Sequence, residues 1–248
     1  FMGVLDGKIA IVTGSNRGIG LGIARAFARE GARLVLAARD AALLNSVAES
    51  VRQLGSEVEA FPTDVTVEAA ADELIERTVD RFGRLDVLVN NAGWGLWGCV
   101  EDVSVDEFKE QFETNFFSII RLIQEVVPTM REKRSGTIVN ISSHAGRIGF
   151  PVSSAYNSSK FALEGLSESL RLELAPFGVN VIIIEPGIVN TNFFKPMKMA
   201  KKSESDTAYK AITDKIILRI MSKVKLGIHP KEVAKTILEA VKSEIPLP

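Results

Sequence analysis

Cysteine and histidine are scarce in this chain of 248 residues, which contains one cysteine and two histidines. The single cysteine, Cys99, excludes an internal disulfide, and His144 and His229 are too far apart for a metal-ligand spacing, so we expect no metal. No apolar run reaches the about 18 residues of a membrane-spanning helix. The formal net charge of −1 provides no overall field that attracts nucleic acid or membranes. These absences predict a soluble, cytoplasmic protein with neither kind of partner.

Apolar residues make up 46% of the sequence, and they occur in short continuous runs that alternate with helical patterns. Such runs are typical of strands that are covered on both faces, as in a parallel sheet. The sequence therefore predicts an α/β fold, a doubly wound parallel sheet in a single domain over residues 1–248. The expected strands cover residues 9–12, 33–38, 58–61, 86–89, 137–141 and 179–184.

Two of the expected helices begin at residues that are suited to capping. Asp40 follows the second strand and is placed to cap the helix that runs toward Gly55. Ser104 and Glu107 have the spacing of a capping box, and they begin a long helix that we expect to reach about Arg131.

A glycine-rich turn joins the first strand to the first helix. It reads Thr13-Gly14-Ser15-Asn16-Arg17-Gly18-Ile19-Gly20. In such a unit one glycine permits the tight turn, a second lets the backbone approach a pyrophosphate and a third lets the helix pack on the strand. The diphosphate then rests on the helix N-terminus. The spacing is G-x-x-x-G-x-G, and with a strand before it and a helix after it this turn predicts nucleotide binding.

Tyr156 and Lys160 are four residues apart near the start of a helical pattern. Side chains at this spacing share one helix face. An ammonium close to a phenol favours the phenolate, so we expect the pKa of Tyr156 to fall from about 10 towards the working pH, where proton transfer is efficient. An ordinary amphipathic helix with one tyrosine and an exposed lysine has the same spacing. This pair alone therefore does not distinguish a catalytic site from such a helix.

Five separated motifs resemble the short-chain dehydrogenase/reductase family in its one-domain form. They are Thr13-Gly14-x-x-x-Gly18-Ile19-Gly20, Asn90-Asn91-Ala92-Gly93, Asn115, Ser143 and Tyr156-x-x-x-Lys160, and Pro186-Gly187 with Thr191 follows them. The resemblance covers nearly the whole chain. It implies a Rossmann fold and an oxidoreductase that uses a nicotinamide cofactor.

The resemblance also implies a role for each motif residue. Tyr156 is the general acid or base, and Lys160 holds the nicotinamide ribose. Ser143, thirteen residues before Tyr156 as in the family, contacts the substrate oxygen, with Ser142 as the neighbouring candidate. Asn115 anchors a water that links Lys160 to solvent. The implied cofactor-binding residues are Gly14, Ser15, Asn16, Arg17, Gly18, Ile19, Gly20, Arg39, Asp64, Val65, Asn91, Ala92, Gly93, Tyr156, Lys160, Pro186, Gly187, Val189 and Thr191.

The end of the second strand predicts which cofactor is used. NAD enzymes of this fold place an acid there to bind the ribose 2′-hydroxyl, but this chain has Ala38 followed by Arg39. Arg17 lies in the glycine-rich turn, where the family holds the adenosine ribose. Two guanidinium groups predict a clamp for a 2′-phosphate, and therefore NADP(H). Asp40, about 20 residues beyond Gly20, is the competing candidate for the acid.

Residues 190–226 are expected to form a lid over the substrate, because they follow the last cofactor motif. An apolar stripe at helical spacing comprises Tyr209, Ile212, Ile216, Ile220 and Met221. A helix packed on the core would show the same stripe. The lid is also basic, with Lys195, Lys198, Lys201, Lys202, Lys210, Lys215, Arg219, Lys223 and Lys225 against Glu204, Asp206 and Asp214. These cations either attract a carrier phosphate or are simply solvated. Trp94, Trp97 and His144 either line the substrate site or only pack near it.

The leading hypothesis is an NADP(H)-dependent reductase or dehydrogenase of a small, apolar carbonyl or alcohol substrate. A 3-oxoacyl-(acyl-carrier-protein) reductase is the alternative within this class, favoured by the basic lid. A catalytically silent nucleotide sensor is the hypothesis from another class, although a sensor has no chemical use for the phenol–lysine pair. The resemblance further implies a homodimer or homotetramer that associates through helices at about 105–131 and 156–176.

Overall fold

The apolar runs form one parallel sheet of six strands, in the order β3-β2-β1-β4-β6-β7. The computed structural model describes residues 3–194, 197–205 and 207–243. The strands are β1 (Ile9–Thr13), β2 (Arg33–Ala38), β3 (Val58–Pro62), β4 (Val87–Asn90), β6 (Gly136–Ile141) and β7 (Val179–Ile184). This is the strand order of a doubly wound dinucleotide-binding fold, so the predicted fold class is confirmed.

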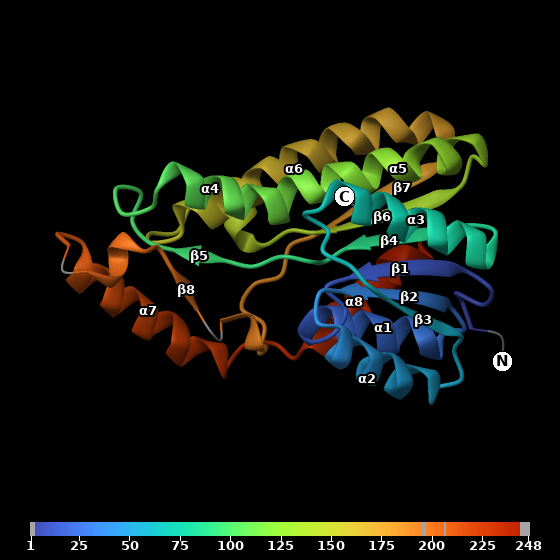
Figure 1. Cartoon of the computed structure of the whole chain (residues 1–248), viewed down its shortest axis with the longest axis horizontal. Helices are drawn as coiled ribbons and strands as arrows, with labels where there is room; N and C mark the ends of the chain where they lie inside the picture. The colour runs from blue at the N-terminus through green and yellow to red at the C-terminus, as the bar shows by residue number, and fades with distance from the viewer. Residues whose placement is uncertain (1–2, 195–196, 206, 244–248) are drawn as a thin grey trace.

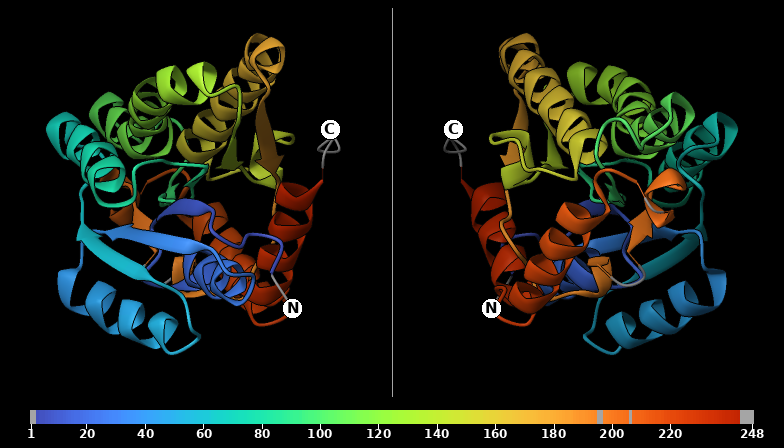
Figure 2. Two further views of the ribbon diagram at one scale, coloured as in Figure 1. Left: turned by 90° about the vertical axis from the view of Figure 1, so that its right-hand side faces the viewer. Right: turned by 90° about the vertical axis from the view of Figure 1, so that its left-hand side faces the viewer.

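Helices cover both faces of the sheet, as Figures 1 and 2 show. One face carries α1 (Gly18–Arg29), α2 (Ala41–Arg52) and α8 (Pro230–Lys242). The other carries α3 (Glu68–Phe82), α5 (Ser118–Glu132) and α6 (Ser154–Leu174). Short 3₁₀ turns occur at His144–Gly146, Ala175–Phe177, Asn192–Phe194 and Lys202–Glu204. None of the helices built from the described residues is long and apolar enough to cross a membrane.

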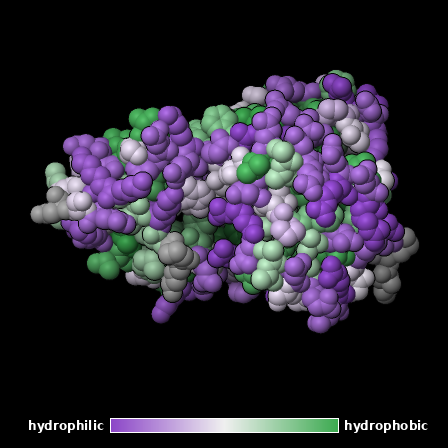
Figure 3. Space-filling model, viewed as in Figure 1, coloured by the Kyte–Doolittle hydropathy of each residue, from purple (hydrophilic) through white to green (hydrophobic). Residues whose placement is uncertain are grey.

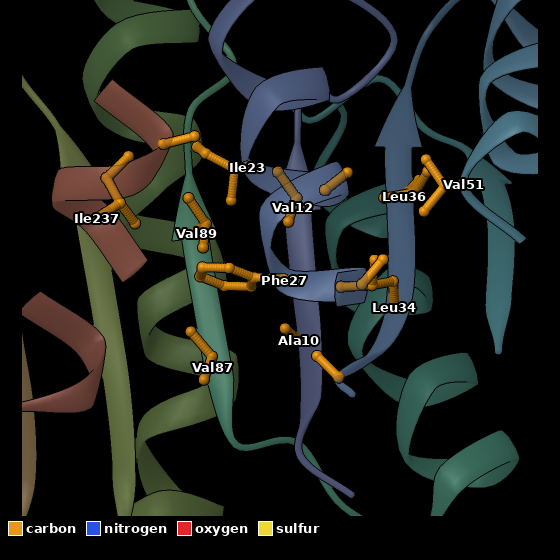
Figure 4. Close-up of a cluster of buried hydrophobic side chains, with 14 of the residues drawn as sticks. Ala10, Val12, Ile23, Phe27, Leu34, Leu36, Val51, Val87, Val89 and Ile237 are labelled. Atoms are coloured by element: carbon orange, nitrogen blue, oxygen red, sulfur yellow. The ribbon is translucent and has the colours of Figure 1, made fainter. Parts of the chain in front are cut away.

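Alternate side chains of each strand enter two separate cores. Ala10 and Val12 of β1 face the core beneath α1, whereas Ile9 and Ile11 face the core on the opposite side of the sheet. Figure 4 shows the first core, in which the fully buried Phe27 of α1 lies against the strands. Because both faces are buried, the strands have no polar side to present, and this explains their continuous apolar sequence.

The predicted capping residues are confirmed. The Asp40 carboxylate accepts a hydrogen bond from the Leu43 amide at 3.0 Å. Ser104 and Glu107 form a complete capping box at the start of α4 (Val105–Phe112). The predicted helix from Ser104 to about Arg131 is confirmed as one unbroken helical run, in which a π-helical segment, Glu113–Phe117, joins α4 to α5. Such a segment inserts an extra residue into the turn and often occurs at functional sites.

The predicted lid lies beside the sheet rather than on it, at the left of Figure 1. β8 (Lys198–Met199) pairs in parallel with β5 (Leu96–Trp97), and α7 (Lys210–Val224) follows. Of the α7 residues only Thr213 and Val224 are buried. The prediction that 190–226 covers the substrate also includes residues 195, 196 and 206, which lie outside the described residues.

Candidate active site

A cavity of about 860 Å³ lies at the carboxyl ends of the strands. It extends from Arg39 and Asp64, which follow β2 and β3, across the glycine-rich turn to Tyr156 on α6. Figure 3 shows the surface hollowed between the part that carries α7 and the part that carries the sheet. β1 and β4 are neighbours whose connections leave toward opposite faces, which creates the crevice where doubly wound sheets bind ligands.

The glycine-rich turn is packed too tightly for other residues at two of its glycines. Gly14 has a φ of +62°, and a Cβ added there would lie 2.9 Å from the Ala92 Cα. A Cβ on Gly20 would lie 2.4 Å from the Gly14 oxygen. The Asn91 side chain fixes this turn to the end of β4 by donating hydrogen bonds to the carbonyls of Thr13 (2.8 Å) and Gly14 (3.1 Å). The turn is therefore held in place beside the cavity by close backbone packing together with the hydrogen bonds from Asn91.

Most of the residues predicted to bind the cofactor line this one cavity. They are Gly14, Asn16, Arg17, Gly18, Ile19, Arg39, Asp64, Val65, Asn91, Ala92, Gly93, Tyr156, Lys160, Pro186, Gly187, Val189 and Thr191. Two predicted residues are not among its lining. Ser15 is fully buried with its hydroxyl directed to the Ala37 carbonyl, and Gly20 packs against Gly14. Their contribution is to the shape of the turn.

Tyr156, Lys160 and Ser143 meet at the buried end of the cavity. Burial raises the pKa of Tyr156 to about 12, and a hydrogen bond with Ser143 opposes that rise. Burial also lowers the pKa of Lys160 to about 8. Its Nζ donates to the Ile141 carbonyl at 2.7 Å and lies 5.9 Å from the centroid of the Tyr156 ring.

The predicted lowering of the Tyr156 pKa is therefore wrong for the protein on its own. The helical spacing correctly places the two side chains on one face, but it does not fix which atom the ammonium reaches. Here the ammonium donates to a backbone carbonyl, and loss of hydration of the phenolate raises the pKa of Tyr156. The phenol consequently keeps its proton at neutral pH.

Asn115 lies in the π-helical segment and is completely buried. Its amide nitrogen donates to the Trp94 carbonyl (3.0 Å) and to the Ser159 hydroxyl (3.2 Å), and its oxygen accepts from the Trp94 amide. It is not among the residues that line the cavity. The prediction that Asn115 anchors a water next to Lys160 stays a prediction.

Aromatic rings surround the phenol on the substrate side. Trp97 stacks on Tyr156 with ring centroids 6.3 Å apart, and Phe193 lies 5.9 Å from it. Phe194 contacts both Trp97 and Phe193. Trp94 and His144 also line the cavity. The structure therefore favours the prediction that Trp94, Trp97 and His144 line the site over the alternative that they only pack near it.

Phe193 and Phe194 were not predicted as site residues. The signal for them was an aromatic pair directly after Thr191, which sequence reasoning passed over because nothing local ties it to residue 156.

Glu164 is a second feature that the sequence analysis missed. It lies on α6 four residues after Lys160, is 4% exposed, and has the Ser142 hydroxyl beside its carboxylate. Arg147, at 3.4 Å, is its ion-pair partner and also bridges Glu168 and Glu185. Burial raises the pKa of Glu164, and its negative charge raises that of Lys160. The same four-residue spacing that identified Lys160 would have identified it.

We expect Glu164→Gln to move the alkaline limb of the pH–activity profile to lower pH. Burial already holds the pKa of Lys160 at about 8, and Glu164 acts against that lowering. Removing its charge lets Lys160 lose its proton at lower pH, so activity that needs the ammonium is lost earlier as the pH rises. The measurement is kcat/KM against pH.

The matched control for this variant is Glu168→Gln. Glu168 also pairs with Arg147, but it is exposed and is not a cause of the Lys160 pKa shift. An unchanged alkaline limb in Glu164→Gln, or an equal shift in both variants, would contradict the assignment.

The fold and this site define a dinucleotide-binding α/β enzyme, and comparison with known proteins gives its family. The short chain dehydrogenase family model matches residues 8–202. An uncharacterised oxidoreductase of Bacillus subtilis is 35% identical over 243 residues, which cover 95% of this chain and 85% of that protein. A putative ketoacyl reductase of monensin polyketide synthesis from Streptomyces virginiae is 34% identical, with coverage of 93% and 88%.

Solved structures agree with this result. A short-chain dehydrogenase/reductase of Burkholderia phymatum in complex with NAD has a TM-score of 0.85 and 28% identity, with 97% of this chain and 87% of that chain covered. A metagenomic short-chain oxidoreductase in complex with NADP has a TM-score of 0.78 and 29% identity, with coverage of 97% and 92%. The chain belongs to the short-chain dehydrogenase family and is an oxidoreductase.

Proposed function

We propose that this protein reduces the carbonyl group of an apolar substrate with NADPH, or oxidises the corresponding secondary alcohol with NADP⁺, using Tyr156 as general acid or base. The observation that carries the proposal is the group of Tyr156, Ser143 and the buried Lys160 at one end of the cavity that the glycine-rich turn borders. The glycines of that turn fit a dinucleotide, because they leave its backbone uncovered by a side chain at Gly14 and Gly18, both of which line the cavity.

The cofactor, when bound, supplies the hydride. The protein supplies the proton and stabilises the charge that develops on the substrate oxygen. Tyr156, with a pKa of about 12, holds a proton at neutral pH and donates it to that oxygen, while Ser143 adds a second hydroxyl at the same point. Lys160 supplies a positive charge beside the phenol as it gives up its proton.

The test is a panel of apolar ketones and 3-oxoacyl thioesters with NADPH, followed by the absorbance of the reduced cofactor. Turnover of one or more ketones is the expected result. Turnover of thioesters alone would favour the 3-oxoacyl-(acyl-carrier-protein) reductase, which the basic lid and the ketoacyl reductase relative support. Cofactor binding with no turnover of any member would favour the nucleotide sensor.

We also propose that the protein is a homodimer or homotetramer in solution. The outer surface of α6 exposes two large apolar side chains, Phe161 (46% exposed) and Leu172 (77%). Light scattering at micromolar concentration is expected to give a multiple of the chain mass of 27.0 kDa. Phe161→Glu with Leu172→Glu is expected to lower that mass, whereas Val67→Glu, an exposed position at the start of α3, is the control. A monomeric wild type would contradict the proposal.

A further inference from the structure

The face that α7 turns toward the cavity combines apolar and cationic side chains. Ile216, Arg219, Ile220 and Lys223 all line the cavity. Their spacing of three, four and seven residues places them in one stripe along the helix. The stripe contains no acidic residue, and the one acid of α7, Asp214, pairs with Lys210 outside it.

Arg219 and Lys223 lack the acidic partners that three other cations of this segment have, and unlike Lys201, Lys215 and Lys225, which are also unpaired among the described residues, they line the cavity. Lys198 pairs with Glu110, Lys202 with Asp102, and Lys210 with Asp214. These pairs fix the segment to its surroundings and account for part of its basic character. Among the described residues, Arg219 and Lys223 have neither an ion pair nor a side-chain hydrogen bond. Lys195 and Asp206 lie outside the described residues.

Among the described residues of the cavity lining, no carboxylate is available to these two cations as a local counter-charge. The acidic lining residues are Asp40 and Asp64, at the far end near β2 and β3. Asp40 accepts a hydrogen bond from the Leu43 amide, and Asp64 accepts from both the amide and the hydroxyl of Thr66. The α7 edge of the cavity is therefore positively charged, and a partly enclosed site strengthens the attraction of an anion.

The space beside the phenol has the opposite character. Trp97, Phe193 and Phe194 wall it with aromatic surface, and the two isoleucines of α7 extend the apolar lining. A ligand that filled this space and reached the α7 edge would be apolar where it reacts and anionic at a distance from that point.

We propose that the substrate of this enzyme is an apolar ketone or alcohol that carries a carboxylate or phosphate group, which Arg219 and Lys223 bind. This inference rests on the proposed oxidoreductase function and specifies its substrate class. The planar guanidinium of Arg219 suits two parallel hydrogen bonds to either anion, and Lys223 one turn further along adds a point charge.

The experiment compares matched ketones that differ only in charge. The probes are ω-benzoylalkanoates of graded chain length, their methyl esters and the corresponding ω-benzoylalkyl phosphates, each assayed with NADPH. We expect kcat/KM for the best anionic probe to exceed that of its ester by at least about tenfold, the effect of one charge-assisted hydrogen bond. The better of the carboxylate and phosphate series identifies the anion.

The variant that tests the two residues is Arg219→Gln with Lys223→Gln. It is expected to abolish the preference for the anion while leaving kcat/KM for the esters and the KM for NADPH unchanged. Lys215→Gln with Lys225→Gln is the control, because it removes the same charge from exposed positions of this segment that do not line the cavity. A second measurement is the calorimetric affinity for ω-phenylalkanoates, which cannot be reduced, in both double variants.

Equal kcat/KM for anionic and neutral ketones in the wild type would overturn the inference. So would a double variant that raises the KM for NADPH and spares the anionic ketones, because the cations would then contact the cofactor. Failure of the proposed function has a different signature, with no turnover of any ketone. In that case the calorimetric affinity still decides, since equal binding of ω-phenylalkanoates by wild type and the Arg219/Lys223 variant would reject the anion site.

Discussion

Tyr156→Phe is expected to lower kcat by about 10²–10⁴-fold, the range that general acid–base catalysis contributes. The substitution removes only the phenolic oxygen, so the ring contacts with Trp97 and Phe193 remain. Loss of a buried hydroxyl also spares the packing of α6, and we expect the variant to fold and to bind NADPH with unchanged affinity. Steady-state kinetics and a fluorescence titration with NADPH measure the two effects separately.

The chain offers a matched control, because its only other tyrosine is Tyr209. The Tyr209 hydroxyl donates to Glu101 at the surface, outside the cavity lining. Tyr209→Phe is expected to retain wild-type kcat. If Tyr156→Phe kept more than about a tenth of the rate, a general-acid role would be untenable, since the missing proton donor accounts for at least about a hundredfold.

The second large effect is expected in cofactor preference, with NADPH used at a kcat/KM well above that of NADH. Arg17 and Arg39 line the cavity at the end beyond β2 and β3, where the proposed cofactor would place its adenosine, and neither has an ion pair among the described residues. Charge-assisted hydrogen bonds contribute about 1.5–3 kcal/mol each. Removing one guanidinium is therefore expected to lower kcat/KM for NADPH by about tenfold to hundredfold and to leave kcat/KM for NADH unchanged. Arg17→Ala and Arg39→Ala should therefore each reduce the NADPH/NADH ratio.

Arg33→Ala is the control for this pair. Arg33 begins the strand that Arg39 follows, and it is paired with Glu57 far from the cavity. Ala38→Asp is the converse variant, since it places an acid where NAD enzymes of this fold bind the ribose 2′-hydroxyl, and it is expected to favour NADH. A wild type that uses NADH equally well would reject the clamp. Asp40 would then be the residue to test, although its carboxylate already caps α2.

The sequence by itself determined the elements and the order of the motifs. Parallel strands buried on both faces must be continuously apolar, which is why the runs at 33–38 and 179–184 coincide with β2 and β7. Capping depends on neighbours within one turn, so the capping roles of Asp40 and Ser104 could be predicted without knowledge of tertiary contacts. The four-residue spacing of Tyr156 and Lys160 is likewise a local property of a helix.

The tertiary structure alone decided what surrounds these residues. Phe193 and Phe194 contact the site because the chain returns there after β7. No local sequence pattern predicts that return. The π-helical turn that carries the buried Asn115 lies within a long helix that the sequence predicts as regular α-helix throughout. The pKa of Tyr156 depends on how much water the assembled site excludes, and this is a property of a packed volume rather than of a spacing. Local periodicity therefore determined the scaffold, and desolvation and long-range contact determined the chemistry that the scaffold supports.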